Sequence, residues 1–514
     1  MPTGSAWDGA VFRMRALSLC RGNTSLMHPG PTTADVPSGP DLGSTLRGTR
    51  SLGADQNARD LCLLSTKRTE GHFGRVSTES GRYLQRGTVL IRFEVENFRS
   101  VLGPAELSMV AVDDRPEVRS FPGFGASLVP VAGIFGPNAS GKSNMLAALA
   151  WLREAVRNSL RNWDDEIPVE PFAFGDARGR DSSFALELEI EGIRFEYLLD
   201  LGRHRVTYEA LFHYPEKKRR RVFERDGNEL TLQRGLGELS GTRALLTDRS
   251  LALSIMRRFD EPLTSAFART LLHIAILGQP LLRHRRNPAA TLSSTLRLFD
   301  GRRPDELELD VFDDDHPDGP EERAVRQRAM SLLRLADLGV ADVEIEETRI
   351  DSGRGDSYRR RSPQLIHTVN DERVPFEYRD ESAGTRAWFE LIGPVLEALR
   401  RGDTLVFDEL DAGLHPTLTA RLIDLFERRG SNPHGAQLIF TSHDTNLLNH
   451  LNRDEIWLTA KDDSGSTRFA AISDFAGERV RRSANLESGY LSGRFGALPD
   501  VSRADVLRDL GLIG

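Results

Sequence analysis

The sequence is poor in cysteine: Cys20 and Cys62 are the only two in 514 residues, and both precede residue 89. The rest of the chain therefore has neither disulfides nor thiol chemistry, as is typical of proteins in a reducing, cytoplasmic compartment. It also lacks any apolar run near the ~18–20 residues that a membrane span needs. No signal-peptide pattern opens the chain. We expect a cytoplasmic protein that makes no membrane contact.

An excess of positive charge is also missing. The net charge of −8 argues against a protein that coats nucleic acid by bulk charge. A content of 39% hydrophobic and 28% charged residues is ordinary for a globular protein. The length predicts two to four domains.

Residues 1–88 lack sustained hydrophobic periodicity and are rich in Gly, Ser, Thr, Arg and Pro. They hold 11 Lys/Arg against 7 Asp/Glu, a net charge of +4, which leaves −12 for the rest of the chain. Such a segment buries little apolar surface, so we expect it to be mostly disordered. It is either a basic tail that touches nucleic acid or non-native upstream sequence. We favour the second interpretation because a regular pattern begins so abruptly at Val89.

What the sequence does contain is a complete phosphate loop. Residues 136–143 read GPNASGKS, which matches G-x-x-x-x-G-K-S. The apolar run Leu128–Phe135 before it predicts a buried strand, and the pattern from Ser143 to about Arg157 predicts a helix. Successive backbone N–H groups at a helix N-terminus form an anion nest. We expect Lys142 to reach the β- and γ-phosphates and the Ser143 hydroxyl to ligate Mg²⁺.

A second strand pattern ends in two acids. Thr404–Glu409 is an apolar run that finishes at Asp408 and Glu409. Asp408 would hold the metal ion opposite Ser143, and Glu409 would orient and deprotonate the attacking water. Asp408 follows Ser143 by 265 residues, so a large insertion divides the nucleotide fold into two lobes.

Two further segments end in polar residues that suit this chemistry. Glu381–Arg386 opens a predicted helix whose start, Ser382-Ala383-Gly384-Thr385, has small side chains. Gln437–Asp444 predicts a buried strand that ends at Thr441-Ser442-His443. A helix start offers free N–H groups to an anion. The alternatives are an ordinary helix N-cap for Ser382 and a strand-end histidine with local partners for His443.

Between these motifs, the pattern predicts three antiparallel strands at Phe184–Ile190, Ile193–Leu201 and Thr207–His213. Residues 242–300 have a helical pattern. An acidic loop at Asp305–Glu322, a helix near 325–338 and a strand near 343–350 follow.

Six segments resemble the ABC-type AAA family ATPases related to SMC, RecF and OLD proteins, and within them the ATPases of bacterial abortive-infection and anti-phage operons. They are Phe93-x-x-x-Asn97-Phe98-Arg99-Ser100, Gly136–Asn144, Glu381–Thr385, Asp408–Pro416, Thr441–His443 and Tyr490–Pro499. The resemblance implies an α/β fold of the P-loop NTPase, ABC-ATPase head type. A mixed central sheet would carry an antiparallel β subdomain and a helical insertion. We expect lobe I at 89–225, a mainly helical insertion at 226–350 and lobe II at 351–514.

The resemblance also implies ATP and Mg²⁺ as cofactors and a head-to-head homodimer with ATP at the interface. Ser382, Gly384 and Thr385 of one subunit would contact the γ-phosphate held by the other, and His443 would sense that phosphate. Related heads place a glutamine between the lobes, for which Gln279 and Gln364 are candidates without a motif. The implied nucleotide-binding residues are Gly136, Pro137, Asn138, Ala139, Ser140, Gly141, Lys142, Ser143 and Asn144.

Three functions remain open. The favoured one is an ATPase whose dimer controls an operon-encoded effector in anti-phage defence. A DNA-repair or DNA-clamp ATPase of the RecF/SMC type is the alternative; its basic runs Lys217–Arg221, Arg283–Arg286 and Arg359–Arg361 would contact DNA or RNA. These runs lack interleaved aromatics, which favours a solvated face. An ATP-gated nuclease is disfavoured, because the 71 residues after His443 show no acidic metal motif.

Overall fold

The computed structural model describes residues 87–121, 125–278, 288–299, 320–336, 339–351, 357–475, 485–495 and 508. Several predictions lie outside these residues: the state of residues 1–86, any role of Gln279 and Arg283–Arg286, and the end of the Tyr490–Pro499 segment. The loop predicted at 305–322 is outside them up to residue 319, and its last three residues belong to a helix. No helix in the described ranges is long and apolar enough to cross a membrane. The four predicted domains remain predictions.

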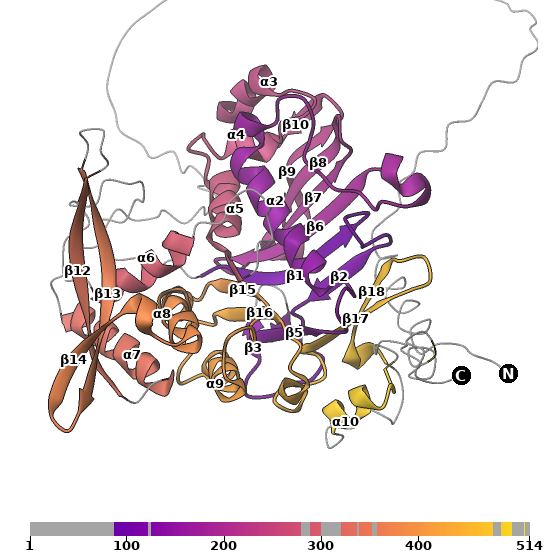
Figure 1. Cartoon of the computed structure of the whole chain (residues 1–514). Helices are drawn as coiled ribbons and strands as arrows, with labels where there is room; N and C mark the ends of the chain where they lie inside the picture. Colours follow the sequence, from indigo (N-terminus) through magenta and orange to yellow (C-terminus); the bar gives the residue numbers. More distant parts are fainter. Residues whose placement is uncertain are drawn as a thin grey trace, which may run out of the picture. The chain divides into compact units, whose positions relative to one another are not determined.

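The central sheet has six strands in the order β11-β15-β16-β5-β17-β18. Five strands run parallel in four neighbouring pairs, and the edge strand β18 is antiparallel to β17. The sheet is therefore mixed, as predicted (Figure 1). Its strands are β5 (Val131–Phe135), β11 (Ala275–Gly278), β15 (Thr404–Asp408), β16 (Gln437–Thr441), β17 (Ile456–Lys461) and β18 (Thr467–Ala471).

A second sheet is antiparallel throughout, in the order β10-β9-β8-β7-β6-β1-β2. The three strands predicted between 184 and 213 are confirmed. Glu191 and Gly192 both have positive φ, 52° and 83°, as a two-residue hairpin turn requires. The strands are β1 (Val89–Glu96), β2 (Ala105–Ser108), β6 (Ser182–Ile190), β7 (Ile193–Leu201), β8 (Val206–His213), β9 (Arg220–Asp226) and β10 (Glu229–Leu232).

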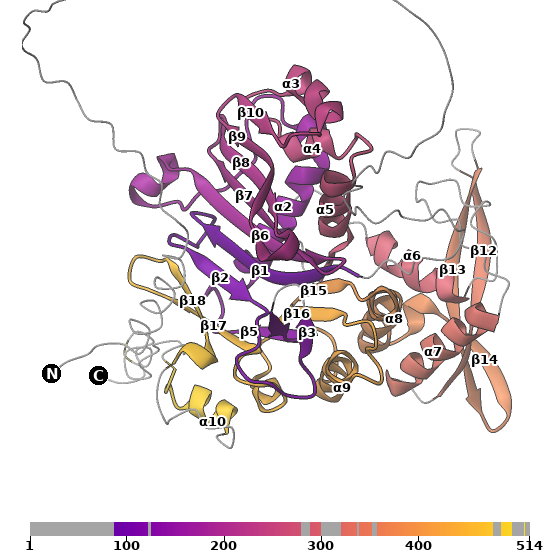
Figure 2. The ribbon, with the colours of Figure 1, turned by 180° about the vertical axis from the view of Figure 1, so that it is seen from behind.

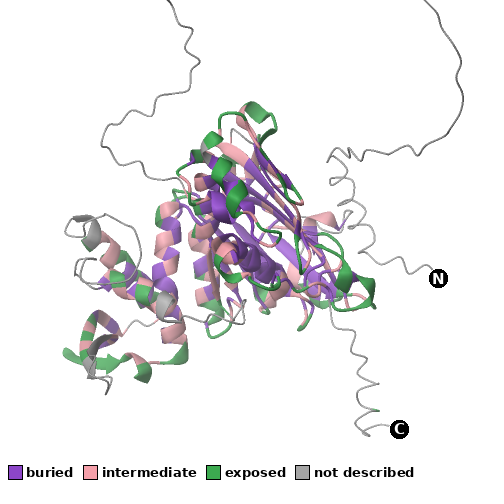
Figure 3. Cartoon of the chain, turned by 90° about the horizontal axis from the view of Figure 1, so that it is seen from above, coloured by how far each residue is buried: buried purple, intermediate pink, exposed green. Residues whose placement is uncertain are grey.

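One helix ties the two sheets together. The helix α2 (Lys142–Asn162) buries its apolar face in a cluster that includes Phe93 and Leu186 of the antiparallel sheet and Val406 and Ile439 of the central sheet. Two more helices pack into this cluster, α4 (Ala252–Met256) and α5 (Pro262–His273), and the short helix α3 (Thr242–Leu245) precedes them in the chain. Figure 3 shows the buried residues concentrated in these strands and helices.

The expectation that residues 242–300 are helical throughout was wrong at one place. Ala275–Gly278 forms β11, which pairs parallel with β15 in the register Gly278↔Asp408. Four residues are too few for periodicity to separate a strand from the end of a helix. The hydrogen-bond ladder with β15 decides the conformation.

The second core cluster joins the central sheet to a three-stranded antiparallel sheet (Figures 1 and 2). The predicted helix near 325–338 and strand near 343–350 are confirmed, whereas two strands after them were not predicted. The elements are α6 (Pro288–Phe299), α7 (Pro320–Ala336), β12 (Val340–Asp351), β13 (Ser357–Val369), β14 (Glu372–Glu377), α8 (Ala383–Arg401) and α9 (Pro416–Glu427). A small hairpin of β3 (Arg119–Phe121) and β4 (Ala126–Leu128) and the short helix α10 (Leu486–Leu491) complete the described part.

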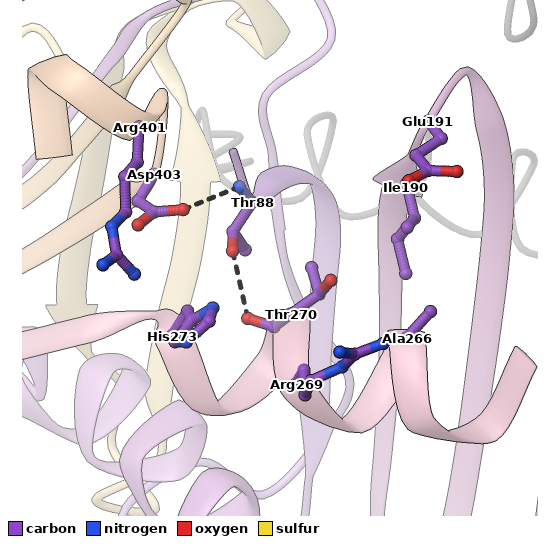
Figure 4. Close-up of a pocket in the computed structure, with 9 residues that line it drawn as sticks. All are labelled: Thr88, Ile190, Glu191, Ala266, Arg269, Thr270, His273, Arg401 and Asp403. Atoms are coloured by element: carbon purple, nitrogen blue, oxygen red, sulfur yellow. Dashed lines mark hydrogen bonds between the residues drawn. The ribbon is translucent and has the colours of Figure 1, made fainter. Parts of the chain in front are cut away.

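Gly87 and Thr88, which we expected in the N-terminal extension, are packed into the fold. The Thr88 backbone N donates to Asp403 Oδ1 at 2.9 Å, and its hydroxyl donates to Thr270 O at 3.1 Å. Figure 4 shows Thr88 between these two partners. A Cβ on Gly87 would lie 2.1 Å from the carbonyl carbon of Gly402, so only glycine fits there.

Candidate nucleotide-binding site

The phosphate loop connects the buried strand β5 to helix α2, as its sequence predicted. Gly136, Ala139 and Gly141 all have positive φ, at 155°, 61° and 105°. This region of φ favours glycine, and Ala139 is the non-glycine exception. The loop therefore has the strongly bent backbone that an anion nest requires.

The Lys142 ammonium folds back over this loop. Its Nζ donates to Gly136 O at 2.8 Å and Pro137 O at 3.1 Å, and lies 3.3 Å from His443 Nδ1. Only 5% of Lys142 is exposed. These oxygens hold the ammonium in place of the phosphate oxygens that we expect it to bind.

Three carboxylates surround that ammonium. Burial lowers the pKa of Lys142 from 10.5 to about 8, and the opposing effects come from Asp411, Asp408 and Glu409. The fold has thus brought the phosphate loop, the end of β15 and the end of β16 together, although they are widely separated in the sequence. Of the three predicted catalytic residues, Glu409 and His443 lie near the buried ammonium of the third, Lys142.

Thr441 connects the two acids at the end of β15. Its hydroxyl donates to Asp408 Oδ1 at 2.7 Å and accepts from the Glu409 backbone N at 2.7 Å. Asp408 is 3% exposed. Glu409 has a φ of 59°, and within the described part of the chain its carboxylate makes no hydrogen bond. One acid is therefore fixed and the other is left to bind a water molecule.

His443 lies beside Lys142 and is not closed off by local partners. Its backbone N donates to Asp411 Oδ2 at 3.1 Å and Oδ1 at 3.3 Å. Its ring faces Lys142, and the residue is exposed. This placement favours the phosphate-sensing prediction over an isolated strand-end histidine.

Ser382 caps helix α8 in the way its alternative interpretation predicted. Its Oγ accepts from the Thr385 backbone N at 3.0 Å and lies 2.8 Å from Thr385 Oγ1. Ser382 is nonetheless exposed, so the cap leaves it accessible to a second subunit. A Cβ on Gly384 would be 3.3 Å from Gly413 O, which places this helix start against the loop after Asp408.

Ser143 and Asp408 are suited to share a magnesium ion with a nucleotide. Ser143 makes no side-chain hydrogen bond to any described residue, and Asp408 uses only Oδ1 in the bonds above. No group of three or more His, Cys, Asp or Glu side chains in the described ranges could hold a metal ion by itself. Mg²⁺ commonly takes one or two protein ligands and completes its shell with phosphates and water. The residues present fit that mode.

The structure describes only one of the two candidates for the inter-lobe glutamine. Gln364 lies on β13, where its side chain donates to Glu346 Oε2 at 2.9 Å. Gln279 lies outside the described residues, so its candidacy remains a prediction.

Several arginines of two basic runs are ion-paired in the part of the chain that the structure describes. In the first run, Arg219 pairs with Glu196 at 3.0 Å and Arg221 with Glu224 at 2.8 Å. On β13, Arg361 Nε lies 3.0 Å from Glu347 Oε1. Charges neutralised in this way favour the solvated-face interpretation over a nucleic-acid interface.

Two residues near the phosphate loop escaped sequence reasoning. Thr459 on β17 and Thr467 on β18 contact Ser140 through their hydroxyls. No local pattern marks either threonine. The pocket in Figure 4, around Thr88 and His273, contains none of the predicted site residues.

The sheet order, the strand–loop–helix unit and the acids at the end of β15, which is separated from β5 by β16, define a P-loop NTPase of the ABC-head type. A family described as "AAA domain, putative AbiEii toxin, Type IV TA system" matches residues 131–449. The match spans more than half of the sequence, so the chain belongs to this AAA-domain family. The resemblance predicted from the motifs is thereby confirmed.

Solved structures similar to this chain include SMC heads. The SMC head domain from Thermotoga maritima is 14% identical, with a TM-score of 0.34, over 74% of this chain and 98% of its own. The head domain of Smc from Pyrococcus furiosus, bound to the C-terminal domain of ScpA, is 12% identical, with a TM-score of 0.36, over 75% and 96%. No curated protein matches the chain.

Proposed function

We propose that the protein binds ATP with Mg²⁺ and hydrolyses it to ADP and phosphate. The observation that carries this proposal is the position of Lys142. The ammonium is held at Gly136 O and Pro137 O, and burial lowers its pKa to about 8 in spite of Asp411, Asp408 and Glu409, so a polyanion would stabilise its charged form. Membership of the AAA-domain family supports the same function.

Each side chain has a separate task in this scheme. Lys142 and the loop N–H groups hold the phosphates, and a magnesium ion held by Ser143 and Asp408 would neutralise developing charge. Glu409 orients the attacking water and accepts its proton. His443, already beside Lys142, hydrogen-bonds the γ-phosphate and so distinguishes ATP from ADP.

We further propose that two copies close around two ATP molecules. The helix start at Ser382, Gly384 and Thr385, where Ser382 is exposed, meets the γ-phosphate bound by the other copy, because its N–H groups and dipole favour an anion. ATP then stabilises the closed dimer only through its higher affinity for that state. The closed dimer controls an effector protein in anti-phage defence; the family description, which names a putative AbiEii toxin and a type IV TA system, supports this role.

Three variants test the proposal. Lys142→Ala should abolish ATP binding, whereas Glu409→Gln should bind ATP but hydrolyse it slowly. In light scattering with ATP, Glu409→Gln should double its mass, and Ser382→Arg added to it should restore the monomer. Equal hydrolysis by wild type and Glu409→Gln would remove the assignment of Glu409.

The defence role has its own test. With its operon neighbour, the wild-type gene should restrict phage, and the Lys142→Ala and Glu409→Gln genes should not. Full protection from this gene alone, or protection that survives Lys142→Ala, would contradict the role.

A further inference from the structure

We propose that Thr459 and Thr467 are positioning residues that hold the phosphate loop in the shape that accepts a triphosphate. They lie on β17 and β18, in sequence 319 and 327 residues from their common partner Ser140. The inference rests on the ATP-binding function proposed above. It gives the strand pair β17 and β18 a role in nucleotide binding.

Thr467 stands in the middle of a directed hydrogen-bond chain. Its Oγ1 donates to Ser140 O at 2.9 Å, and a hydroxyl has one hydrogen to give. In the 2.7 Å contact between Ser100 Oγ and Thr467 Oγ1, Ser100 must therefore be the donor. Ser100 in turn accepts from Asn144 Nδ2 at 2.5 Å. The chain runs from helix α2 through Ser100 and Thr467 and ends on the phosphate-loop backbone.

Thr459 makes a second chain on the same residue. Its Oγ1 donates to Phe135 O at 3.3 Å, so Ser140 Oγ is the donor in their 2.5 Å contact. Ser140 is thus held at its side chain by Thr459 and at its carbonyl by Thr467. Both threonines and Ser140 are buried, so water does not compete for these bonds.

The threonines also explain why two loop positions are glycine. A Cβ on Gly136 would lie 2.3 Å from Thr459 Oγ1, and one on Gly141 would lie 2.1 Å from Thr467 Oγ1. Besides their positive φ, these glycines leave room for the two hydroxyls to approach the backbone. The loop and the strand pair behind it therefore fit each other closely.

The two hydroxyls differ from Lys142 in what happens when phosphate enters. Lys142 must leave Gly136 O and Pro137 O to reach the ligand, whereas the threonine bonds do not involve Lys142. A backbone with Ala139 at a φ of 61° persists only where its surroundings over-determine it. The threonines supply that constraint in the bound state, so their loss weakens nucleotide binding more than catalysis.

The test removes each hydroxyl and keeps the side-chain shape. Thr467→Val and Thr459→Val should each raise the KM for ATP by roughly tenfold, the effect of losing one buried hydrogen bond, with kcat changed by less. Thr467→Ser and Thr459→Ser should restore KM because they keep the donor. Thr242→Val is the matched control: Thr242 is fully buried in α3, and its hydroxyl has no hydrogen-bond partner among the residues that the structure describes. Its kinetics should equal those of wild type.

A second readout does not depend on turnover. Without nucleotide, amide hydrogen exchange in residues 136–143 should accelerate in the two valine variants and stay unchanged in the serine variants and in Thr242→Val. Unchanged KM and exchange in both valine variants, while Lys142→Ala still abolishes ATP binding, would overturn the positioning role and leave the ATPase intact. A lower melting temperature with unchanged KM would also overturn it. If loop exchange accelerates in the valine variants but the wild-type protein itself binds no ATP, the result would instead count against the proposed function.

Discussion

The hydroxyl of Thr441 donates to Asp408 Oδ1 at 2.7 Å while it accepts from the backbone N of Glu409 at 2.7 Å. One side chain on β16 therefore fixes the last carboxylate of β15 and the backbone of the residue that follows this strand. Because both strands are buried, no water replaces this hydroxyl if it is lost. The geometry of Asp408 and Glu409 therefore depends on Thr441.

Thr441→Val should therefore lower kcat by roughly tenfold or more, since a buried carboxylate oxygen that loses its donor costs about 1–3 kcal/mol. ATP affinity should change little, and the Mg²⁺ concentration for half-maximal rate should rise. Thr441→Ser retains the donor and should behave like wild type. A valine variant with normal kcat and normal Mg²⁺ dependence would show that this bond has no catalytic role.

ATP affinity should fall as pH rises above about 8. The pKa of Lys142 in the free protein is about 8, and phosphate prefers the charged ammonium, so above this pH binding must take up a proton. The linkage predicts a loss of up to about tenfold per pH unit. Isothermal titration with ATP between pH 7.5 and 9.5 measures it.

Lys142→Arg is the control for this prediction. A guanidinium stays charged throughout that range, so the variant should bind more weakly but with little pH dependence. The same dependence in both proteins would show that another group is responsible.

A chain that begins at Gly87 should match the full-length protein in melting temperature and ATPase rate. One that begins at Val89 should melt several degrees lower, because it loses the Thr88 bonds to Asp403 and Thr270; each is worth about 1 kcal/mol. Differential scanning calorimetry distinguishes the two. Equal melting of both chains would show that Gly87 and Thr88 contribute nothing.

Glu427 should make stability depend on pH between about pH 4.5 and 8. Burial, followed by Glu455, Asp424 and Glu117, raises its pKa from 4.5 to about 8, against the effect of Arg115. Its Oε1 is buried and has no hydrogen-bond partner among the described residues. The folded state thus holds a proton that the unfolded state has lost between these two values, so stability falls as pH rises through that window.

Glu427→Gln should accordingly raise the melting temperature by several degrees at pH 9 and leave it nearly unchanged at pH 5. The matched comparison is Glu377→Gln, at an exposed position of β14, which should have no effect at either pH. A glutamine variant less stable than wild type at pH 9 would show that the charged form is the native one.

The sequence alone was sufficient to predict those parts of the candidate site that lie in one continuous sequence motif. The loop at Gly136–Ser143 and the acids Asp408 and Glu409 each follow an apolar strand, so their spacing predicted where they lie. The strand β13 was missed because Arg359–Arg361 resembles a solvated run; Glu347 on β12 pairs with Arg361 across the ladder, and no local pattern reveals that pairing.

Contacts over long sequence separations were beyond the reach of such patterns. Thr459 and Thr467 are ordinary strand residues in isolation, and only the pairing of β17 with β5 brings them behind the phosphate loop. The capping bond of Ser382 was one of two interpretations in the sequence. The fold realises the cap and still leaves the residue exposed to a second copy.

The segment between Gly278 and Glu381 is held by contacts at both of its ends. At its start, a Cβ on Gly278 would lie 2.1 Å from Asp408 O; at its end, Glu381 accepts from His367 Nε2 at 2.8 Å and directly precedes Ser382. In the proposed dimer, Asp408 serves the ATP bound by its own subunit, whereas Ser382 serves the ATP bound by the other. A partner that moves this segment would therefore displace residues at both ATP sites, because one continuous backbone joins those residues. The two sites would then be mechanically coupled.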